Sequence, residues 1–161
     1  MPLIRRCLNE IPALVAYWDA NERCHFANEA YLEWFGRAPE AMEGMTLGEL
    51  LGPIYDKNLP YIQGALRGER QIFRRAIPIL SGEIRQSLAT YTPHIGSGRV
   101  LGFTVHVADI TPVLQREKEL EAALLETISA LERTKRSFRS KELGELRARL
   151  LKMCGESDRS D

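Results

Sequence analysis

The chain changes character at Thr111-Pro112. Seven of the eight prolines precede this point, whereas the residues after it are mostly Glu, Leu, Lys, Arg and Ala. Threonine is a favourable N-cap because its hydroxyl accepts a hydrogen bond from an unpaired amide, and proline suits the first helical position because it has no N–H there to leave unpaired. The sequence therefore predicts a globular domain that ends at Thr111 and a long helix that begins at Pro112.

Apolar residues alternate with polar ones along several short segments of the first part, and turn residues separate these segments. Such alternation is typical of strands with one buried face. Ala13–Asp19 and Arg23–Ala27 are predicted to form a hairpin. Three later strands, joined by glycine-containing turns, are predicted at Arg70–Ile79, Glu83–Ile95 and Arg99–Ile110. This order predicts an α+β domain with one five-stranded antiparallel sheet.

Short helices are expected between the second and third strands. Asn28 is a favourable N-cap for the first of them, and Gly36 is a favourable residue just past its C-terminus. The other helices are predicted at Pro39–Met42, Thr46–Leu51 and Pro53–Leu66. Pro60 is expected to divide the longest of these in two.

The last predicted strand has two different faces. Alternation places Leu101, Phe103, Val105 and Val107 on the first face, and Gly102, Thr104, His106 and Ala108 on the second. Small residues suit a surface on which a helix lies. We therefore expect a helix to cover the second face, with His106 pointing away from the interior of the domain.

The residues after Thr111 carry an incomplete heptad pattern. Apolar side chains recur at spacings of four and seven, at Val113, Leu120, Leu124, Leu131 and Phe138. A helix this long cannot bury its apolar stripe alone, so it must fold back on its own sheet or pair with a second chain. We favour a homodimer with parallel chains, and the sequence leaves an antiparallel arrangement open.

The expected organisation has four parts. Residues 1–12 form an N-terminal helical cap, residues 13–111 the globular domain, residues 112–154 a coiled-coil type helix for dimerisation and signalling, and residues 155–161 a disordered tail. Positive charges cluster at Arg133–Lys141, where the helix is expected to bend or fray.

Charge and cysteine content exclude several classes of protein. Lys and Arg together number 22, as do Asp and Glu, so the overall charge gives no attraction to nucleic acid or anionic membranes. The basic stretch has no accompanying reading helix or aromatic platform, and we expect no nucleic-acid partner. Cys7, Cys24 and Cys154 form no paired motif, and no signal peptide or membrane-spanning run of about 20 apolar residues is present. These features predict a cytoplasmic protein with reduced thiols.

Several segments, in the correct order, resemble the PAS family, in the variant found in bacterial sensor kinases, cyclic-di-GMP enzymes and chemotaxis-type receptors. The segments that carry the resemblance are Tyr17–Gly52, Leu59–Pro78, Ser81–Ile95 and Gly98–Thr111. The last of them ends in Asp109–Thr111, which resembles the family's terminal DIT motif, the link between the last strand and an output helix. The resemblance implies a sheet and helical flap around a small cavity, dimerisation through flanking helices, and signal relay through Asp109 and Thr111.

The cofactors that some PAS members hold are not expected here. Flavin photoreceptors need a cysteine in a short helix that corresponds to Ala41–Leu51, and none is present. Haem members take an axial histidine from the long helix, and Pro53–Gly68 has none. The three histidines, all on strands or at a strand end, are His25, His94 and His106. No metal site, phosphoacceptor histidine or catalytic motif is recognisable, so the cofactor is left open and the chain is expected not to be an enzyme.

A cavity is the remaining candidate site. The residues expected around it are Trp34, Leu50, Ile62, Leu66, Phe73, Arg75, Ser87, Ala89, Tyr91, Phe103 and Val105. The alternative is that these side chains fill an ordinary core. Alternation puts Arg75 in phase with Phe73, facing inward, where its planar fork could anchor a carboxylate or phosphate. Alternatively, Arg75 pairs with a local acid or reaches solvent at the sheet edge.

The sequence thus predicts a sensory or scaffold PAS module that homodimerises and relays a small-molecule or partner-derived signal to a downstream protein or domain through its C-terminal helix. The alternative is a small α+β cavity protein, an enzyme or a carrier, in which Arg75 or Tyr91 acts on a bound metabolite.

Overall fold

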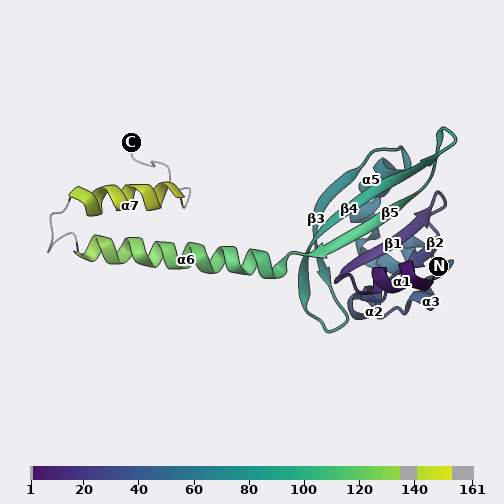
Figure 1. The fold of residues 1–161 in the computed structure, drawn as a ribbon, viewed down its shortest axis with the longest axis horizontal. Helices are drawn as coiled ribbons and strands as arrows, with labels where there is room; N and C mark the ends of the chain where they lie inside the picture. The colour runs from purple at the N-terminus through teal and green to yellow at the C-terminus, as the bar shows by residue number, and fades with distance from the viewer. Residues whose placement is uncertain (1, 135–140, 154–161) are drawn as a thin grey trace. The chain divides into compact units, whose positions relative to one another are not determined.

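The structure is a computed structural model that describes residues 2–134 and 141–153. The chain divides into two compact units, Met1–Thr111 and Pro112–Asp161. The elements of the first unit, drawn in Figure 1, are α1 (Pro2–Asn9), β1 (Ala13–Asp19), β2 (Cys24–Ala27), α2 (Ala30–Phe35), α3 (Pro39–Met42), α4 (Leu47–Leu51), a 3-10 turn η1 (Gly52–Ile54), α5 (Tyr55–Leu66), β3 (Gln71–Pro78), β4 (Ile84–Gly96) and β5 (Arg99–Asp109).

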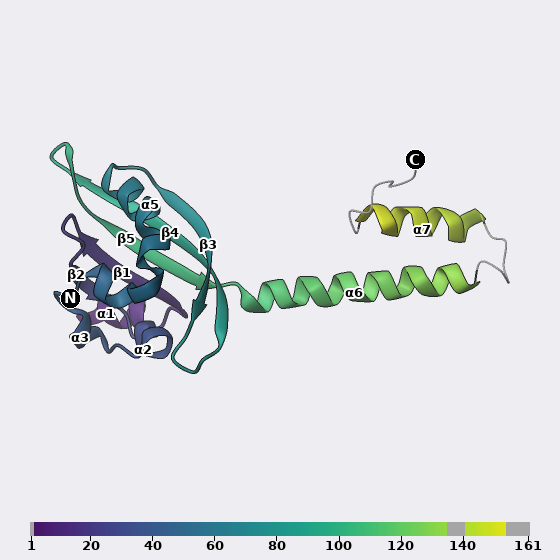
Figure 2. The same ribbon diagram turned by 180° about the vertical axis from the view of Figure 1, so that it is seen from behind.

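The five strands form one antiparallel sheet in the order β2-β1-β5-β4-β3 (Figure 2). The predicted α+β class and five-stranded sheet are confirmed, and no predicted strand end differs from the observed one by more than one residue. Between β4 and β5, Ser97 and Gly98 have φ values of 50° and 75°. Two consecutive positive φ angles are what a tight type I′ hairpin turn requires.

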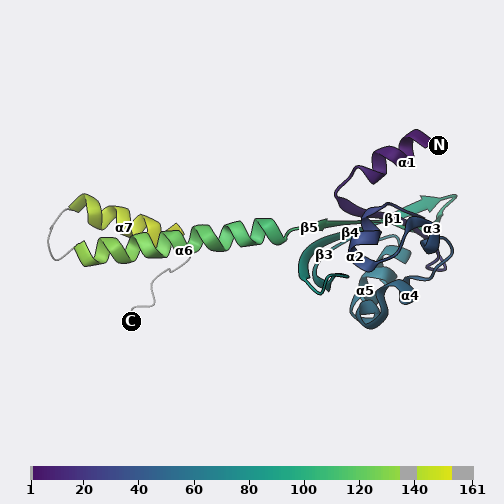
Figure 3. The same cartoon turned by 90° about the horizontal axis from the view of Figure 1, so that it is seen from below.

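One face of the sheet carries the core. Buried side chains recur at every second residue along four of the strands, as the pleat of a strand dictates. These residues are Leu14, Ala16, Trp18, Phe73, Ile77, Ser87, Ala89, Tyr91, Phe103, Val105 and Val107. Figure 3 shows α2, α4 and α5 on one side of the sheet and α1 on the other. The interior of the domain therefore lies between the sheet and the short helices.

Asn28 does not cap α2, contrary to the prediction. The N-cap position is Glu29, and no side chain bonds to the helix end there. Asn28 is fully buried; its side chain accepts a hydrogen bond from the Val15 N–H at 3.0 Å and donates to the carbonyls of Leu8 and Ala13 at 2.9 and 2.8 Å. Buried backbone groups need hydrogen-bond partners. Asn28 provides them for three such groups and so connects α1 and β1 to the start of α2.

The other helix signals hold, with one exception. Gly36 ends α2 with a φ of 66°, as predicted, and Thr46 forms a capping box with Glu49 at the start of α4. Pro60, however, does not divide α5, which continues from residue 55 to residue 66. Pro60 and Asp56 are both exposed, so the Asp56 carbonyl, which loses its helical partner to the proline, faces water.

The second face of β5 is not covered by a helix as predicted, because Thr104 and His106 are exposed. His106 does point away from the interior, as expected. The Tyr17 hydroxyl hydrogen-bonds His94 Nδ1 at 2.9 Å, and a Cβ at Gly102 would lie 2.8 Å from the same hydroxyl. The same Cβ would lie only 2.2 Å from the Trp18 backbone carbonyl, so the glycine lets the backbone of β1 lie close to β5.

Thr111 joins the sheet to the following helix in a different way from the predicted cap. Its hydroxyl accepts a hydrogen bond from the Gln86 N–H of β4 at 2.7 Å, and the Asp109 carboxylate accepts one from the Thr111 N–H at 2.8 Å. The Ile110 N–H donates to the Gln86 carbonyl at 2.8 Å. Since the pairing of β5 with β4 ends at Asp109, these bonds extend the sheet contacts up to Thr111.

Helices α6 (Thr111–Thr134) and α7 (Lys141–Met153) follow. Of the five predicted seam residues, Val113 and Leu120 are 66% and 51% exposed. Leu124 and Leu131 are half-buried. Phe138 lies outside the described residues, as do most of the predicted bend at Arg133–Lys141 and the predicted tail.

Ile128, which the predicted seam omitted, is the buried apolar residue of α6. An ion pair between Glu132 and Arg147 joins α6 to α7, and the views in Figures 1 and 3, taken at right angles, agree that the two helices lie side by side. None of the described helices combines the length and the apolarity that a membrane crossing needs.

We predict that Asn28→Ala lowers the free energy of unfolding by about 2–4 kcal/mol, because three buried backbone groups lose their partner. Urea denaturation measures this loss. Asn21→Ala is the matched control, since Asn21 is exposed, and it should stay within about 0.5 kcal/mol of the parent chain. Equal stabilities for the two variants would contradict the assigned role of Asn28.

Candidate ligand cavity

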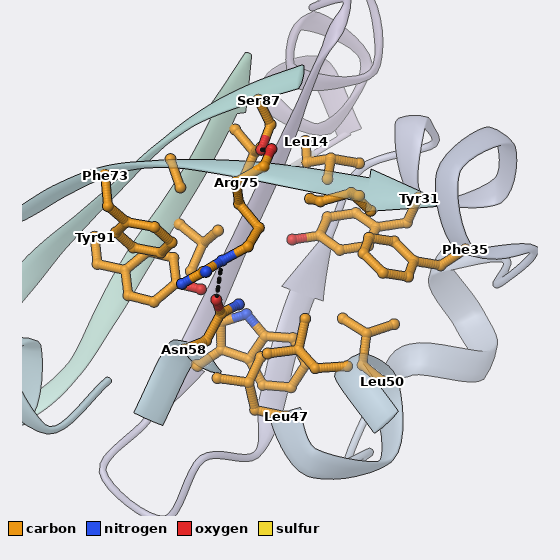
Figure 4. A pocket seen from close by; sticks show the side chains of 16 residues that line it. Leu14, Tyr31, Phe35, Leu47, Leu50, Asn58, Phe73, Arg75, Ser87 and Tyr91 are labelled. Carbon is orange, nitrogen blue, oxygen red and sulfur yellow. Dashed lines mark hydrogen bonds between the residues drawn. The ribbon is translucent and has the colours of Figure 1, made fainter. Parts of the chain in front are cut away.

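Side chains from the sheet and from α2, α4 and α5 enclose a cavity on the inner face of the sheet (Figure 4). The enclosed free space measures about 30 Å³, which is room for about one or two water molecules. The sixteen residues around it are Leu14, Trp18, Tyr31, Phe35, Leu47, Leu50, Leu51, Asn58, Phe73, Arg75, Ile77, Ser87, Ala89, Tyr91, Val105 and Val107. Most of the wall is apolar, with a few polar groups among the hydrocarbon.

Seven of the eleven residues expected around a cavity border this one. They are Leu50, Phe73, Arg75, Ser87, Ala89, Tyr91 and Val105. Six of the seven lie on strands, where period-two alternation identifies the inner face. The structure brings these residues together, and their binding of a ligand stays a prediction.

The other four expected residues do not border the cavity. Trp34 is buried with its ring 5.2 Å from the guanidinium carbon of Arg85. Ile62 and Phe103 are fully buried in the core, and Leu66 is partly buried against it. Three of these four lie on helices, where the direction of a side chain depends on how the helix packs and does not follow from alternation.

Nine lining residues were not predicted: Leu14, Trp18, Tyr31, Phe35, Leu47, Leu51, Asn58, Ile77 and Val107. Alternation could have identified those on strands, since Leu14 and Trp18 share one face of β1. Asn58 gave no such signal, because a polar residue within a predicted helix is ordinarily assigned to solvent. In the structure it is only 3% exposed.

Arg75 extends from β3 toward α5. Its Nε donates to the Asn58 side-chain oxygen at 3.0 Å, and its Nη2 donates to the Lys57 carbonyl at 2.7 Å. Figure 4 shows the arginine side chain reaching into the site with its guanidinium beside Asn58. The paired residue on β4, Ser87, donates from its hydroxyl to the Arg75 carbonyl at 2.8 Å. Hydrogen bonds therefore fix both the side chain and the backbone of Arg75.

Aromatic rings line the wall beside Arg75. The Phe73 ring stacks on Tyr61 with centroids 3.8 Å apart and meets Tyr91 edge-on at 5.2 Å. The guanidinium carbon of Arg75 lies 5.5 Å from the Phe73 centroid and 5.9 Å from that of Tyr61. At these distances the ring faces attract the positive charge, which places an apolar surface and a cation side by side.

Two tyrosine hydroxyls stay protonated near the cavity. Burial raises the pKa of Tyr91 strongly, and the opposing effects of the Arg75 charge and the Asn58 amide are smaller. Burial likewise raises the pKa of Tyr31 well above its usual value. In Figure 4 the Tyr31 hydroxyl points toward the Arg75 side of the site. Both groups therefore remain available as hydrogen-bond donors at neutral pH.

The Trp18 indole lies beside the Tyr31 hydroxyl. Trp18 is fully buried, and its interaction with Tyr31 opposes the rise in the pKa of that tyrosine, although the contact does not meet strict hydrogen-bond geometry. Because buried polar groups are nearly always paired in proteins, the Tyr31 oxygen is the natural acceptor for this N–H.

Arg85 links the flap helix α2 to the junction at Asp109. It forms ion pairs with Glu33 on α2 and with Asp109 on β5, and its guanidinium lies over the Trp34 ring. The two carboxylates hold the pKa of Arg85 above its usual value, chiefly through the hydrogen bond to Glu33. Arg85 therefore connects α2, which supplies Tyr31 and Phe35 to the cavity, with Asp109.

The cavity offers binding chemistry: one cation and several N–H and O–H donors within apolar walls. Within residues 2–134 and 141–153, no three His, Cys, Asp or Glu side chains come together in a way that could hold a metal ion. Of the two described cysteines, Cys24 is buried and Cys7 is exposed, and neither borders the cavity.

The family model described as the PAS fold matches residues 8–115. No curated protein matches the chain by sequence. Among solved structures, VqmA bound to DPO is 20% identical, with a TM-score of 0.60 over 68% of this chain and 57% of that one. The VqmA–ligand–DNA complex of Vibrio cholerae is 22% identical, with a TM-score of 0.59 over 69% of this chain and 52% of that one.

The phage VqmA–DPO complex is 19% identical, with a TM-score of 0.60 over 96% of this chain and 87% of that one. The PAS domain of BvgS from Bordetella pertussis is 22% identical, with a TM-score of 0.55 over 76% of this chain and 96% of that one. At these identities the likeness shows the fold. The chain spans just over half of the length of the first two VqmA chains.

We predict that Arg75 and Asn58 are energetically coupled. Arg75→Met and Asn58→Leu should each lower the free energy of unfolding, and the double variant should lose about 1–2 kcal/mol less than the sum, because each single change leaves a partly buried polar group unpaired. Urea denaturation of the four proteins gives the coupling energy. Arg74→Met is the control, since Arg74 is exposed on the same strand; additive losses for the Arg75–Asn58 pair would show that their contact does not stabilise the cavity.

Proposed function

The chain belongs to the PAS fold family, and from this premise we propose that it is a sensor module which binds a small molecule in its cavity, homodimerises and relays the binding state through α6. The observation that carries the proposal is the cavity itself. Arg75, Asn58 and the Tyr31 hydroxyl converge on one apolar space, and convergent polar groups in an apolar pocket are typical of ligand sites.

The comparisons support ligand sensing as the role of the domain. Two similar structures are complexes of VqmA proteins with DPO, and another is an RNA-binding light-oxygen-voltage receptor. All three share the fold of this domain. A non-catalytic role is the one these relatives favour, and it takes precedence over the alternative in which Arg75 or Tyr91 converts a metabolite.

The relay that we propose starts at the flap. A ligand that contacts Tyr31 would move or rigidify α2, and Glu33 on the same helix is paired with Arg85. Arg85 also contacts Asp109, whose carboxylate accepts a hydrogen bond from the Thr111 N–H. The ordering of α2 can thus change the bonds that hold the first residue of α6.

Dimerisation is proposed to use the exposed apolar side chains of α6. Val113 and Leu120 lie seven residues apart and are both more than half exposed, and a second copy of α6 would cover them in a coiled-coil arrangement. A VqmA dimer from Vibrio cholerae is among the similar structures, which favours a dimer of this chain.

The expectation that nucleic acid is not a partner loses support from the comparisons, because one similar structure is a VqmA–ligand–DNA complex. Only part of that chain aligns with this one. We therefore propose a sensing role for the described domain. The target of its signal, which could be DNA, is left open.

We predict that native mass spectrometry of the full chain purified from its host detects a dimer with a bound small molecule. Leu120→Glu should give a monomer, because a charge in the apolar seam cannot be buried. Gln115→Glu, at an exposed position of the same helix, is the control and should leave the dimer intact. A monomeric parent chain without a bound molecule would refute the sensor proposal.

A further inference from the structure

We propose that α7 and the α6 helix of a second copy of the chain compete for one apolar face of α6, so that the contact between α6 and α7 limits dimerisation. This inference rests on the proposed function, in which α6 forms the dimer, and adds a contact within the chain that regulates it.

The apolar face of α6 is a single stripe. With 3.6 residues per turn, the described seam residues lie within about 40° of one another around the helix axis; they are Val113, Leu120, Leu124 and Leu131. Leu124 and Leu131 are half-buried, whereas Val113 and Leu120 are 66% and 51% exposed. The exposed half of the stripe therefore continues the covered half and does not form a second face of the helix.

Helix α7 lies beside the C-terminal half of α6 (Figures 1 and 3). Ile128, which adjoins the stripe, is 5% exposed, and an isolated helix does not bury its own side chains to this extent. Glu132 of α6 pairs with Arg147 of α7 at 2.5 Å, and the half-buried Leu143 and Leu150 lie on the same side of α7 as Arg147. α7 thus covers positions that a coiled coil of two α6 helices needs.

The length of α7 leaves the N-terminal half of the stripe uncovered. α7 begins beside the C-terminal end of α6 and runs back along it (Figure 1), and it ends at Met153, six residues after Arg147. Since both helices rise by the same amount per residue, α7 reaches back from Glu132 to about residue 126. Val113 and Leu120 lie beyond this point, so another helix must cover them if they are to be buried.

The charges beside Val113 and Leu120 favour a second α6 in parallel orientation. With these two residues at d positions of a heptad, Arg116 falls at a g position and Glu121 at the following e position. In a parallel pair the g residue of one chain meets the e residue of the other, so Arg116 and Glu121 would form an ion pair on each side of the dimer. Both side chains are exposed and therefore accessible to a partner.

The contacts between α6 and α7 are weak enough for such a partner to replace them. In the described part of the second unit, Ile128 is the one buried apolar side chain, and buried apolar area is what stabilises a pair of helices. Nε of Arg147 is buried and has no acceptor among the described residues, which is unfavourable. A change that releases α7 should therefore shift the equilibrium toward the dimer.

Sedimentation equilibrium of the full chain, at constant pH and ionic strength, measures the dissociation constant of the dimer. Leu150→Glu places a charge against α6 and releases α7. The constant should fall at least about fourfold, because both copies must expose α6 and each contributes a factor of two when α7 is docked half of the time. Leu146→Glu is the matched control: Leu146 is on the same helix but 43% exposed, and the constant should change by less than about twofold.

A charge swap tests the same contact without a change in apolar surface. Arg147→Glu places a second carboxylate beside Glu132 and should strengthen the dimer, and Glu132→Arg combined with Arg147→Glu should restore the constant of the parent chain. Leu120→Glu combined with Leu150→Glu should give a monomer, because the stronger dimer uses the α6 stripe. Far-ultraviolet circular dichroism and urea denaturation check that the first unit stays folded in each variant.

A weaker dimer of Leu150→Glu would overturn the proposal, because it would show that two intact pairs of α6 and α7 associate through their outer faces. An unchanged dissociation constant would overturn it as well. In both cases a parent dimer that carries a small molecule leaves the proposed function standing. A parent monomer without a bound molecule refutes the proposed function, even if Leu150→Glu dimerises.

Discussion

The guanidinium of Arg75 hydrogen-bonds the Asn58 side chain and the Lys57 carbonyl on α5, and this contact holds the edge strand β3 against the helix. β3 has a neighbouring strand on one side only, so side-chain contacts across the interior must fix its distance from α5. The Ser87 hydroxyl anchors the same residue from β4. These bonds cross the interior beside the cavity and fix the spacing of β3 and α5 there.

The same arrangement explains why the cavity suits recognition. The bonds to α5 use part of the guanidinium and orient the rest, and the rings of Phe73 and Tyr61 give the cation an apolar setting. The polar groups around it include the Asn58 amide and the hydroxyls of Tyr31 and Tyr91. Pre-organised donors bind an acceptor without reorganisation. Two residues from Ser87 on β4, Arg85 connects the flap helix α2 to Asp109, and α2 also supplies Tyr31 and Phe35 to the cavity.

Much of the sheet and of its inner face could be predicted from the sequence, because side chains alternate between the two faces of a strand. Alternation along the strands placed Arg75, Ser87 and Tyr91 on the inner face, and the sheet itself was predicted to within one residue at each strand end. The prediction failed where contacts between distant elements determine the position of a side chain. Asn28 was assigned to a cap but is bound by three backbone groups from other elements, and Trp34 was assigned to the cavity but lies beneath Arg85. A lone buried asparagine such as Asn58 gives no periodic signal, because its burial depends on an arginine from another element.

The central claim is that a small molecule binds in the cavity beside Trp18 and Arg75. The chain has two tryptophans, Trp18 and Trp34, so its indole N–H groups give two signals in a proton–nitrogen correlation spectrum, which Trp18→Phe assigns. Removal of the molecule that co-purifies with the chain should move the Trp18 signal, because Trp18 lines the cavity, and leave the signal of Trp34, which does not line it, in place. A Trp18 signal that is the same with and without that molecule would contradict the account.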